Sequence, residues 1–287
     1  MPENVKKMLK KPVVLRLPDM DKIQVHRDLL YKETDEIDLK FDVYEPRDLE
    51  SGERRGVVIF VHGGVPIDWL KDFDSRSWGQ YQGWGRLVAT SGLIGVTFTR
   101  RPEFSEERGS ARFNAAVNDI DDLIIYIRKH ANELSINKNL LGIWACSAGV
   151  PTGFRAGILH SSEYIKCMVA LYGLLDLRQR PDSISVATHP SWIRNAPEKD
   201  LKEFSPLYHM EKFPSKVAPL LVIKAGRDHE TINCNLNHFV KEASRINLDI
   251  EFINYPDGQH AFDILDDTDR SQQIMQRTLS FMKEHLL

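Results

Sequence analysis

The chain has 287 residues, of which 42% are hydrophobic and 28% are charged, and its formal net charge is −3. These values suit one large α/β domain with a full core, and they give no electrostatic basis for a nucleic-acid partner. The three cysteines lie at no metal-ligand spacing and are odd in number, so we expect a reduced, cytoplasmic protein. We expect no membrane span, because no apolar run approaches the ~20 residues that one needs.

The first part of the chain is rich in β-prone residues. Residues 13–17, 23–31 and 37–44 are short runs of this kind, and the alternation over the last run is typical of antiparallel strands with one solvated face. From residue 57 the pattern changes to continuous apolar runs, which indicate parallel strands buried on both faces. These runs are residues 57–61, 93–98, 140–144, 168–171, 220–223 and 250–255.

Helical periodicity fills the intervals between these runs. The predicted helices are residues 78–90, 113–130, 235–246 and 270–286. Strands that alternate with helices predict βαβ units with right-handed crossovers. We therefore expect an α/β fold: a mostly parallel central sheet with antiparallel N-terminal strands, and helices on both faces. No linker or repeat divides the chain, so residues 1–287 are expected to form one domain.

One segment interrupts the alternation of strands and helices. Residues 173–217 contain no strong strand or long helix but hold five prolines, at positions 181, 190, 197, 206 and 214, together with Trp192. So long a connection in a compact domain is usually functional or a small subdomain. We expect a modest cap over the C-terminal edge of the sheet, where ligands bind in open α/β sheets.

A serine flanked by small residues follows the apolar run 140–144. The segment Ala145-Cys146-Ser147-Ala148-Gly149 has the layout of a nucleophile elbow, a strand-to-helix turn so tight that only very small side chains fit beside the serine. Centring the elbow on Cys146 would put Trp144 at a flanking position, where it cannot fit. Ser147 is therefore the predicted nucleophile, and Cys146 a small buried residue.

A serine hydroxyl needs a base to accept its proton, and the base needs a carboxylate to hold its tautomer. Asp228 follows the run 220–223, and His260 lies in the loop after the run 250–255. The order serine, acid, histidine and the position of each residue after a strand favour these two. Asp257 and Asp263 are the alternative acids. His229 is the nearest competing base, but adjacent residues rarely point at one another.

An oxyanion hole is expected beside this serine. The backbone amide of Ala148 is one predicted donor, because it follows the nucleophile. Gly63 or Gly64, directly after the run 57–61, supplies the second, since paired glycines let N–H groups turn toward a developing alkoxide without a β-carbon in the way. Gly64 is slightly preferred.

At these motifs the chain resembles the α/β-hydrolase-fold serine esterases, near the hormone-sensitive-lipase-like, feruloyl-esterase-like and dienelactone-hydrolase-like branches. The segments that carry the resemblance are His62-Gly63-Gly64, Ala145-Cys146-Ser147-Ala148-Gly149, Ala225-Gly226-Arg227-Asp228 and Gly258-Gln259-His260-Ala261-Phe262. It extends from about residue 42 to the C-terminus. Two departures are the alanine at position 145, where glycine is usual, and Val65 and Pro66 after the glycine pair.

The resemblance implies a cofactor-independent hydrolase that cleaves a small-molecule carboxylic ester through an acyl-enzyme. An amidase or peptidase, including a formamidase, would use the same residues, and a ligand-binding protein that has kept the fold is the third alternative. We expect no metal and no cofactor, because the common metal and nucleotide motifs do not occur. Trp69 and Trp192 are the candidate pocket residues, whereas Trp84 is expected to pack a helix against the sheet. The sequence does not indicate the oligomeric state.

Overall fold

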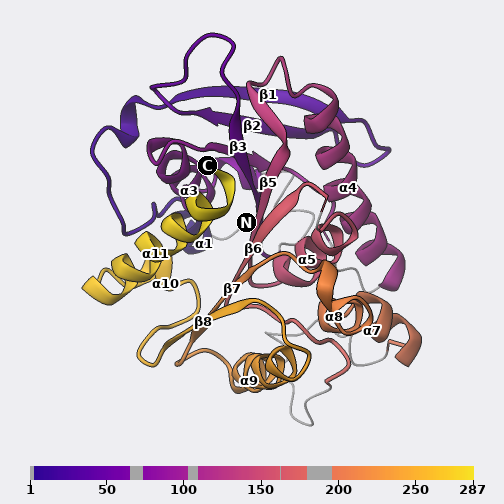
Figure 1. Ribbon diagram of the computed structural model, residues 1–287. Coiled ribbons are helices and arrows are strands. Elements are labelled where there is room, and N and C mark those ends of the chain that lie inside the picture. The colour runs from indigo at the N-terminus through magenta and orange to yellow at the C-terminus, as the bar shows by residue number, and fades with distance from the viewer. Residues whose placement is uncertain (1–2, 65–73, 103–108, 162, 180–195) are drawn as a thin grey trace.

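The computed structural model describes residues 3–64, 74–102, 109–161, 163–179 and 196–287. Its centre is an eight-stranded sheet in the order β1-β2-β4-β3-β5-β6-β7-β8, which runs from the top to the bottom of Figure 1. The strands are β1 (Gln24–Lys32), β2 (Leu39–Glu45), β3 (Arg55–Val61), β4 (Ile94–Phe98), β5 (Ile136–Cys146), β6 (Ile165–Leu171), β7 (Leu220–Ala225) and β8 (Ile250–Tyr255). β1, β2 and β4 pair antiparallel, and all pairs from β4 to β8 are parallel. The predicted mixed sheet is confirmed.

Helices cover both faces of the sheet (Figure 1). One face is packed by α4 (Gly109–Lys129), α5 (Gly149–Leu159), α7 (Glu198–Phe204), α8 (Pro206–Lys212) and α9 (Glu230–Arg245). The other face is packed by α1 (Glu3–Leu9), α3 (Gly79–Thr90), α10 (Phe262–Leu265) and α11 (Asp269–Leu286). None of the described helices is long and apolar enough to cross a membrane.

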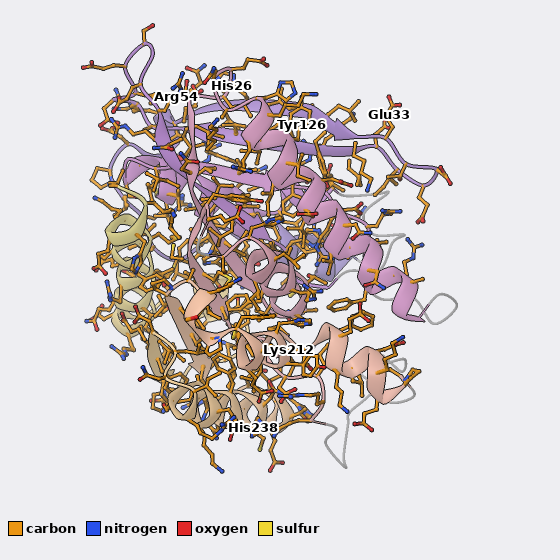
Figure 2. The ribbon with its side chains drawn as sticks, turned by 45° about the vertical axis from the view of Figure 1, so that its right-hand side comes forward. His26, Glu33, Arg54, Tyr126, Lys212 and His238 are labelled. Atoms are coloured by element: carbon orange, nitrogen blue, oxygen red, sulfur yellow. The ribbon has the colours of Figure 1, made fainter. Side chains whose placement is uncertain are left out.

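The two faces of the sheet carry separate cores because side chains alternate along each strand. In β3, Ile59 packs with the first group of helices and Phe60 with the second. Tyr126, labelled in Figure 2, lies on α4 and packs its ring against Phe41 of β2 at 5.6 Å between centroids. On the opposite face Trp84 of α3 is fully buried, as expected for a packing residue.

Residues 13–17, expected as a strand, are irregular instead, so that prediction was wrong. Val13 and Leu15 are buried on the sheet face that α3 covers, and Val13 lies against α3, where a β-carbon on Gly83 would be 2.6 Å from a Val13 methyl group. The amide of Val14 donates to the carbonyl of Asp263 at 2.8 Å. Burial against helices therefore takes the place of strand pairing.

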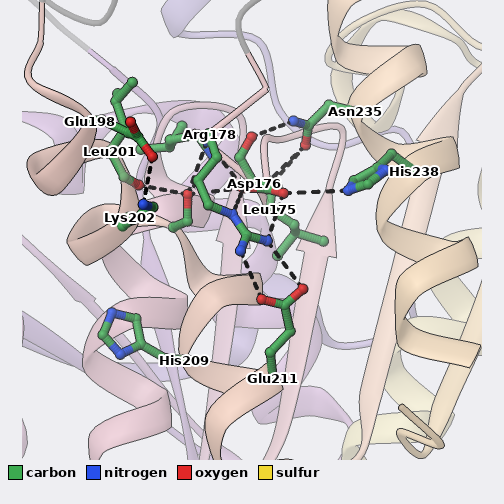
Figure 3. Close-up of polar contacts among 12 residues, drawn as sticks. Leu175, Asp176, Arg178, Glu198, Leu201, Lys202, His209, Glu211, Asn235 and His238 are labelled. Carbon is green, nitrogen blue, oxygen red and sulfur yellow. Dashed lines mark hydrogen bonds and ion pairs between the residues drawn. The ribbon is translucent and has the colours of Figure 1, made fainter. Parts of the chain in front are cut away.

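The described part of the segment 173–217 contains two short α-helices, α7 and α8, and one turn of 3₁₀ helix at Pro214–Lys216. Phe204 of α7 stacks on Phe113 of α4 with ring centroids 4.2 Å apart, which fixes α7 to the body of the domain. Figure 3 shows a second anchor: buried Asp176 accepts hydrogen bonds from Arg178, which also pairs with Glu211 of α8. Residues 180–195, including Trp192, lie outside the described residues.

Candidate active site

Three parallel strands end at the same edge of the sheet, and each is followed by one predicted site residue. Ser147 follows β5, Asp228 lies in the loop after β7, and His260 lies in the loop after β8. His260 Nε2 lies 3.0 Å from Ser147 Oγ, and His260 Nδ1 lies 2.7 Å from Asp228 Oδ2. With the proton on Nδ1, the imidazole donates to the carboxylate and accepts from the serine hydroxyl. The three side chains therefore form one continuous hydrogen-bonded chain.

The elbow around Ser147 has the strained backbone that such a turn requires. Ser147 has φ of 51°, in the left-handed region that non-glycine residues rarely adopt. Gly149 begins α5 directly against β3, where an added β-carbon would be 2.4 Å from the carbonyl oxygen of His62. The tight turn thus carries the serine to the C-terminal edge of the sheet and brings it beside the loop after β3.

Asp228 is held by its own loop and by the start of α9. Its side chain is 5% exposed, and its Oδ1 accepts the backbone N–H of His229 at 2.7 Å. The side chain of His229 does not compete as a base, because it caps α9 by accepting from the amide of Thr231 at 3.3 Å. The alternative acid Asp257 instead forms an exposed ion pair with Arg227 at 2.7 Å.

Cys146 is buried at the end of β5 and lacks the properties of a nucleophile. Burial raises the pKa of its thiol to about 12, so the reactive thiolate is scarce near neutral pH. Its neighbour is the hydroxyl of Tyr81, at 3.5 Å from the sulfur. The geometry therefore favours Ser147 at the elbow.

The loop after β3 is fixed by buried side chains that bind its backbone. Tyr81 accepts the amide of Gly63 at 2.9 Å, and Arg100 donates to the carbonyl of His62 at 2.9 Å. His62 Nδ1 donates to the carbonyl of Gly63 at 2.8 Å. Burial, with a further contribution from Arg100, lowers the pKa of His62 to about 3, so the imidazole is neutral and acts as a structural donor.

These contacts show which of the candidate amides are free to act as oxyanion donors. The Gly63 amide is already engaged by Tyr81, whereas the Gly64 and Ala148 amides donate to no other group within the described part of the chain. Gly64 is also exposed, so a ligand can reach its amide. The arrangement favours Gly64 and Ala148 as the pair of donors.

The structure also brings in residues that sequence reasoning missed. Tyr172 packs its ring on His260 with centroids 4.7 Å apart, and Asp263 accepts from the Tyr172 hydroxyl at 2.7 Å. Of these two, only Asp263 had a sequence signal, as an alternative acid close to His260. In the structure it binds the Tyr172 hydroxyl instead of the His260 ring. Trp69 and Trp192, the candidate pocket residues, lie outside the described residues. Within the described ranges, no group of three or more His, Cys, Asp or Glu side chains could hold a metal ion.

We compared the chain with protein families, curated proteins and solved structures. The family model BD-FAE matches residues 41–243, which is more than half of the chain. A search of curated proteins found no match.

Among solved structures, the apo form of esterase 2 from Thermogutta terrifontis has a TM-score of 0.67 at 20% identity, over 94% of this chain and 96% of that chain. The same esterase phosphorylated by paraoxon has a TM-score of 0.65 at 19% identity, over 94% and 95%. A hyperthermophilic esterase from Pyrobaculum calidifontis has a TM-score of 0.68 at 18% identity, over 98% of this chain and 87% of that chain. At these identities the likeness shows a shared fold, that of the α/β-hydrolases.

Proposed function

This chain belongs to the BD-FAE family of α/β-hydrolase esterases, and we propose that it cleaves carboxylic esters with Ser147 as nucleophile, His260 as base and Asp228 as the residue that orients His260. The observation that carries this proposal is the hydrogen-bonded chain of Ser147 Oγ, His260 Nε2 at 3.0 Å, His260 Nδ1 and Asp228 Oδ2 at 2.7 Å. His260 is 40% exposed at its side chain, so a substrate can reach the junction between base and nucleophile.

In the first half of the reaction, Ser147 Oγ attacks the ester carbonyl carbon while its proton passes to His260 Nε2. The carbonyl oxygen becomes an alkoxide, and the amides of Ala148 and Gly64 stabilise its charge. The tetrahedral intermediate collapses, the bond to the alcohol oxygen breaks, and His260 returns the proton to that oxygen. The alcohol leaves, and the acyl group remains on Ser147.

In the second half, a water molecule takes the place of the alcohol. His260 accepts its proton, the hydroxide attacks the acyl carbon, and the second tetrahedral intermediate expels Ser147 Oγ. His260 returns the proton to the serine, and the carboxylic acid is released. Asp228 stays ionised throughout and stabilises the imidazolium that forms twice in each cycle.

The related fold lends support to this covalent step. Esterase 2 of Thermogutta terrifontis was solved phosphorylated by paraoxon and also with propionate bound. We propose that Ser147 takes the same kind of phosphoryl adduct, and that the substrate is a small-molecule ester.

Turnover of p-nitrophenyl acetate, butyrate and octanoate, measured beside the p-nitroanilides of the same acids, tests this proposal. Each pair shares an acyl group and differs only in the leaving atom, so the comparison isolates the ester or amide preference. We expect steady ester turnover with at least about 100-fold slower anilide turnover, because an anilide is much harder to expel. Faster anilide turnover would make the chain an amidase, and no turnover of either would favour a binding protein.

We also propose that the chain is one domain in which residues 173–217 act as a cap. The support is positional: the segment leaves β6 at the edge that carries Ser147, before the chain crosses to the opposite edge, where the parallel strand β7 begins. Trp192 and Trp69 are proposed to line the acyl pocket, so Trp192→Ala should change kcat/KM unequally between short and long acyl esters. A uniform change, or none, would place Trp192 outside the pocket.

The cytoplasm is the proposed location. All three cysteines are free in the structure, and two of them, Cys146 and Cys167, are buried. Free thiols fit a compartment that keeps thiols reduced. Fractionation of the native cells, with detection of the full-length protein, would test this assignment.

A further inference from the structure

Asp263, a buried carboxylate three residues beyond His260, has no role in the proposed reaction mechanism. Asp263 has no exposed surface, and three neutral donors bind it: Trp84 Nε1 at 2.7 Å, Gln80 Nε2 at 2.8 Å and the Tyr172 hydroxyl at 2.7 Å. Gln80 Nε2 also donates to the Tyr172 oxygen at 2.9 Å. Tyr172, Gln80 and Asp263 therefore form a closed triangle of hydrogen bonds, with Trp84 as its fourth member.

This network joins three distant parts of the chain directly behind the site. Gln80 and Trp84 come from α3, Tyr172 follows β6, and Asp263 lies in α10. Side chains that bind one another at four points in a buried setting have little freedom, because each lost bond would leave a polar group unsatisfied. The position of the Tyr172 ring is therefore fixed from both ends, by its backbone and by its hydroxyl.

The ring of Tyr172 is in turn the surface on which His260 rests. The two rings have centroids 4.7 Å apart and are tilted by 57°. Ser147 and Asp228 bind the two nitrogens of His260, and hydrogen bonds at these two atoms do little to prevent the ring from turning about the line that joins them. The ring of Tyr172 packs against the imidazole, so it opposes a rotation that would lengthen the 3.0 Å contact with Ser147.

The backbone is strained on both sides of this contact between Tyr172 and His260. Ala261 has φ of 60° and Tyr172 has φ of 40°, so the residue after the base and the residue beneath it both adopt the left-handed region. Such conformations persist only where the surroundings hold them. Phe262 is fully buried between Tyr172 and Tyr255, and with Asp263 it ties the chain down immediately after the strained residue.

We propose that Asp263 and Tyr172 are positioning residues for His260: the buried network of Asp263 fixes the Tyr172 ring, and that ring holds the imidazole in line with Ser147. This inference rests on the proposed function, because it assigns a role in the step that His260 performs. Burial and the nearby Asp263 charge raise the pKa of Tyr172 well above its usual value, so its hydroxyl stays a donor throughout the working range of the enzyme.

Two variants test the inference in the full-length protein. In Asp263→Asn, an NH₂ group replaces one of the two carboxylate oxygens that accept hydrogen bonds. This group would face another donor, so the network must rearrange. Since a misplacement of about 1 Å can lower a rate 100-fold, we expect kcat for p-nitrophenyl acetate to fall roughly 10- to 100-fold. Tyr172→Phe keeps the ring and removes only its hydroxyl, and kcat is expected to fall by about 3- to 10-fold. KM should change less than kcat in both.

Asp42→Asn is the matched control for general destabilisation. Asp42, which lies on β2 at the other end of the sheet from β8, is also buried and accepts from Arg76 and Arg27. This variant should lower the unfolding temperature without changing kcat. Folding of all three variants is checked by circular dichroism, and kcat is measured well below each unfolding temperature.

A spectroscopic readout separates positioning from stability. The proton between His260 Nδ1 and Asp228 gives a low-field proton resonance, which should broaden or shift in Asp263→Asn and Tyr172→Phe but stay unchanged in Asp42→Asn. The double variant Tyr172→Phe with Asp263→Asn should be no slower than Asp263→Asn alone, because both act through one network. If Asp263→Asn does not fold, Tyr172→Phe carries the test.

The inference is overturned if the folded variants keep kcat within about twofold of the parent and leave the resonance unchanged, or if Asp42→Asn loses kcat equally. Failure of the proposed function would look different. In that case the parent itself would neither turn over esters nor react with paraoxon, and the variants could not be compared.

Discussion

Gly149 and His62 meet without space for a side chain between them, since a β-carbon on Gly149 would be 2.4 Å from the His62 carbonyl oxygen. The first residue of α5 is thereby packed onto the loop after β3. This contact sets the distance between the nucleophile and the proposed oxyanion donors. Backbone rather than side chains forms this contact, so a methyl group at position 149 fits only if the two segments move apart.

Gly149→Ala should therefore separate Ser147 from the oxyanion loop. We expect kcat to fall about 100-fold for p-nitrophenyl acetate and the free energy of unfolding to fall by about 1–3 kcal/mol. Gly52→Ala is the control: Gly52 has φ of +84° but no atom within 4 Å of an added β-carbon. The Gly52→Ala variant should lose stability but keep its kcat. Full activity of Gly149→Ala would mean that this contact does not set the geometry.

Tyr81→Phe should loosen the oxyanion loop, because Gly63 loses the acceptor that holds its amide at 2.9 Å. We expect kcat to fall about tenfold with a smaller change in KM, since the donors act on charge that develops in the transition state. Tyr126→Phe, on α4, should leave kcat unchanged. Equal changes in kcat from the two substitutions would show that Tyr81 does not hold the oxyanion loop in place.

Asp228→Asn should leave the fold intact and disable the base. An amide in place of the carboxylate favours the wrong tautomer of His260, which in serine hydrolases of this type lowers kcat by roughly 10⁴. Asp257→Asn is the control, because Asp257 lies in an exposed ion pair with Arg227. If Asp257→Asn proved the more damaging change in ester turnover, the acid would be misassigned.

The neutral burial of His62 predicts a pH-dependent stability. Its pKa is lowered to about 3 in the folded protein, against a value near 6.5 in the unfolded chain. Below pH 6.5 the unfolded chain binds a proton that the folded protein does not, so stability falls as the pH falls toward 3. At pH 5 the loss from His62 is about 2 kcal/mol.

Urea unfolding of the parent and of His62→Gln at pH 7.5 and pH 5 measures this loss. Contributions from other groups, including His209, whose pKa burial also lowers, are common to both proteins. We expect the parent to lose about 2 kcal/mol more than His62→Gln between the two pH values. Equal losses would show that His62 does not titrate in this way.

The placement of the candidate site residues could be predicted from the sequence because it depends on local patterns. Ser147, Asp228 and His260 each follow an apolar run that forms a buried parallel strand, and the carboxyl ends of parallel strands meet at one edge of the sheet. The sheet and the helices α3, α4, α9 and α11 could be predicted for the same reason. The irregular structure of residues 13–17 could not, since Val13 and Leu15 are buried in the core on the α3 side of the sheet while their backbone pairs with no described strand.

The supporting contacts could not be predicted, because each depends on residues far apart in the sequence. Gln80 and Asp263 lie 183 residues apart and meet only after α3 and α10 pack on the same face of the sheet. Likewise, the choice between Gly63 and Gly64 depends on Tyr81, a residue of α3 with no motif of its own.

Covalent labelling with paraoxon tests most directly whether Ser147 is the nucleophile. Intact-protein mass spectrometry gives the stoichiometry, fragmentation of the labelled peptide separates Ser147 from the adjacent Cys146, and ester turnover is followed in parallel. We predict one phosphoryl group on Ser147 in the parent and in Cys146→Ala, each with most of its turnover. Ser147→Ala should be folded, unlabelled and inactive. A label and turnover that persist in Ser147→Ala but vanish in Cys146→Ala would contradict the account.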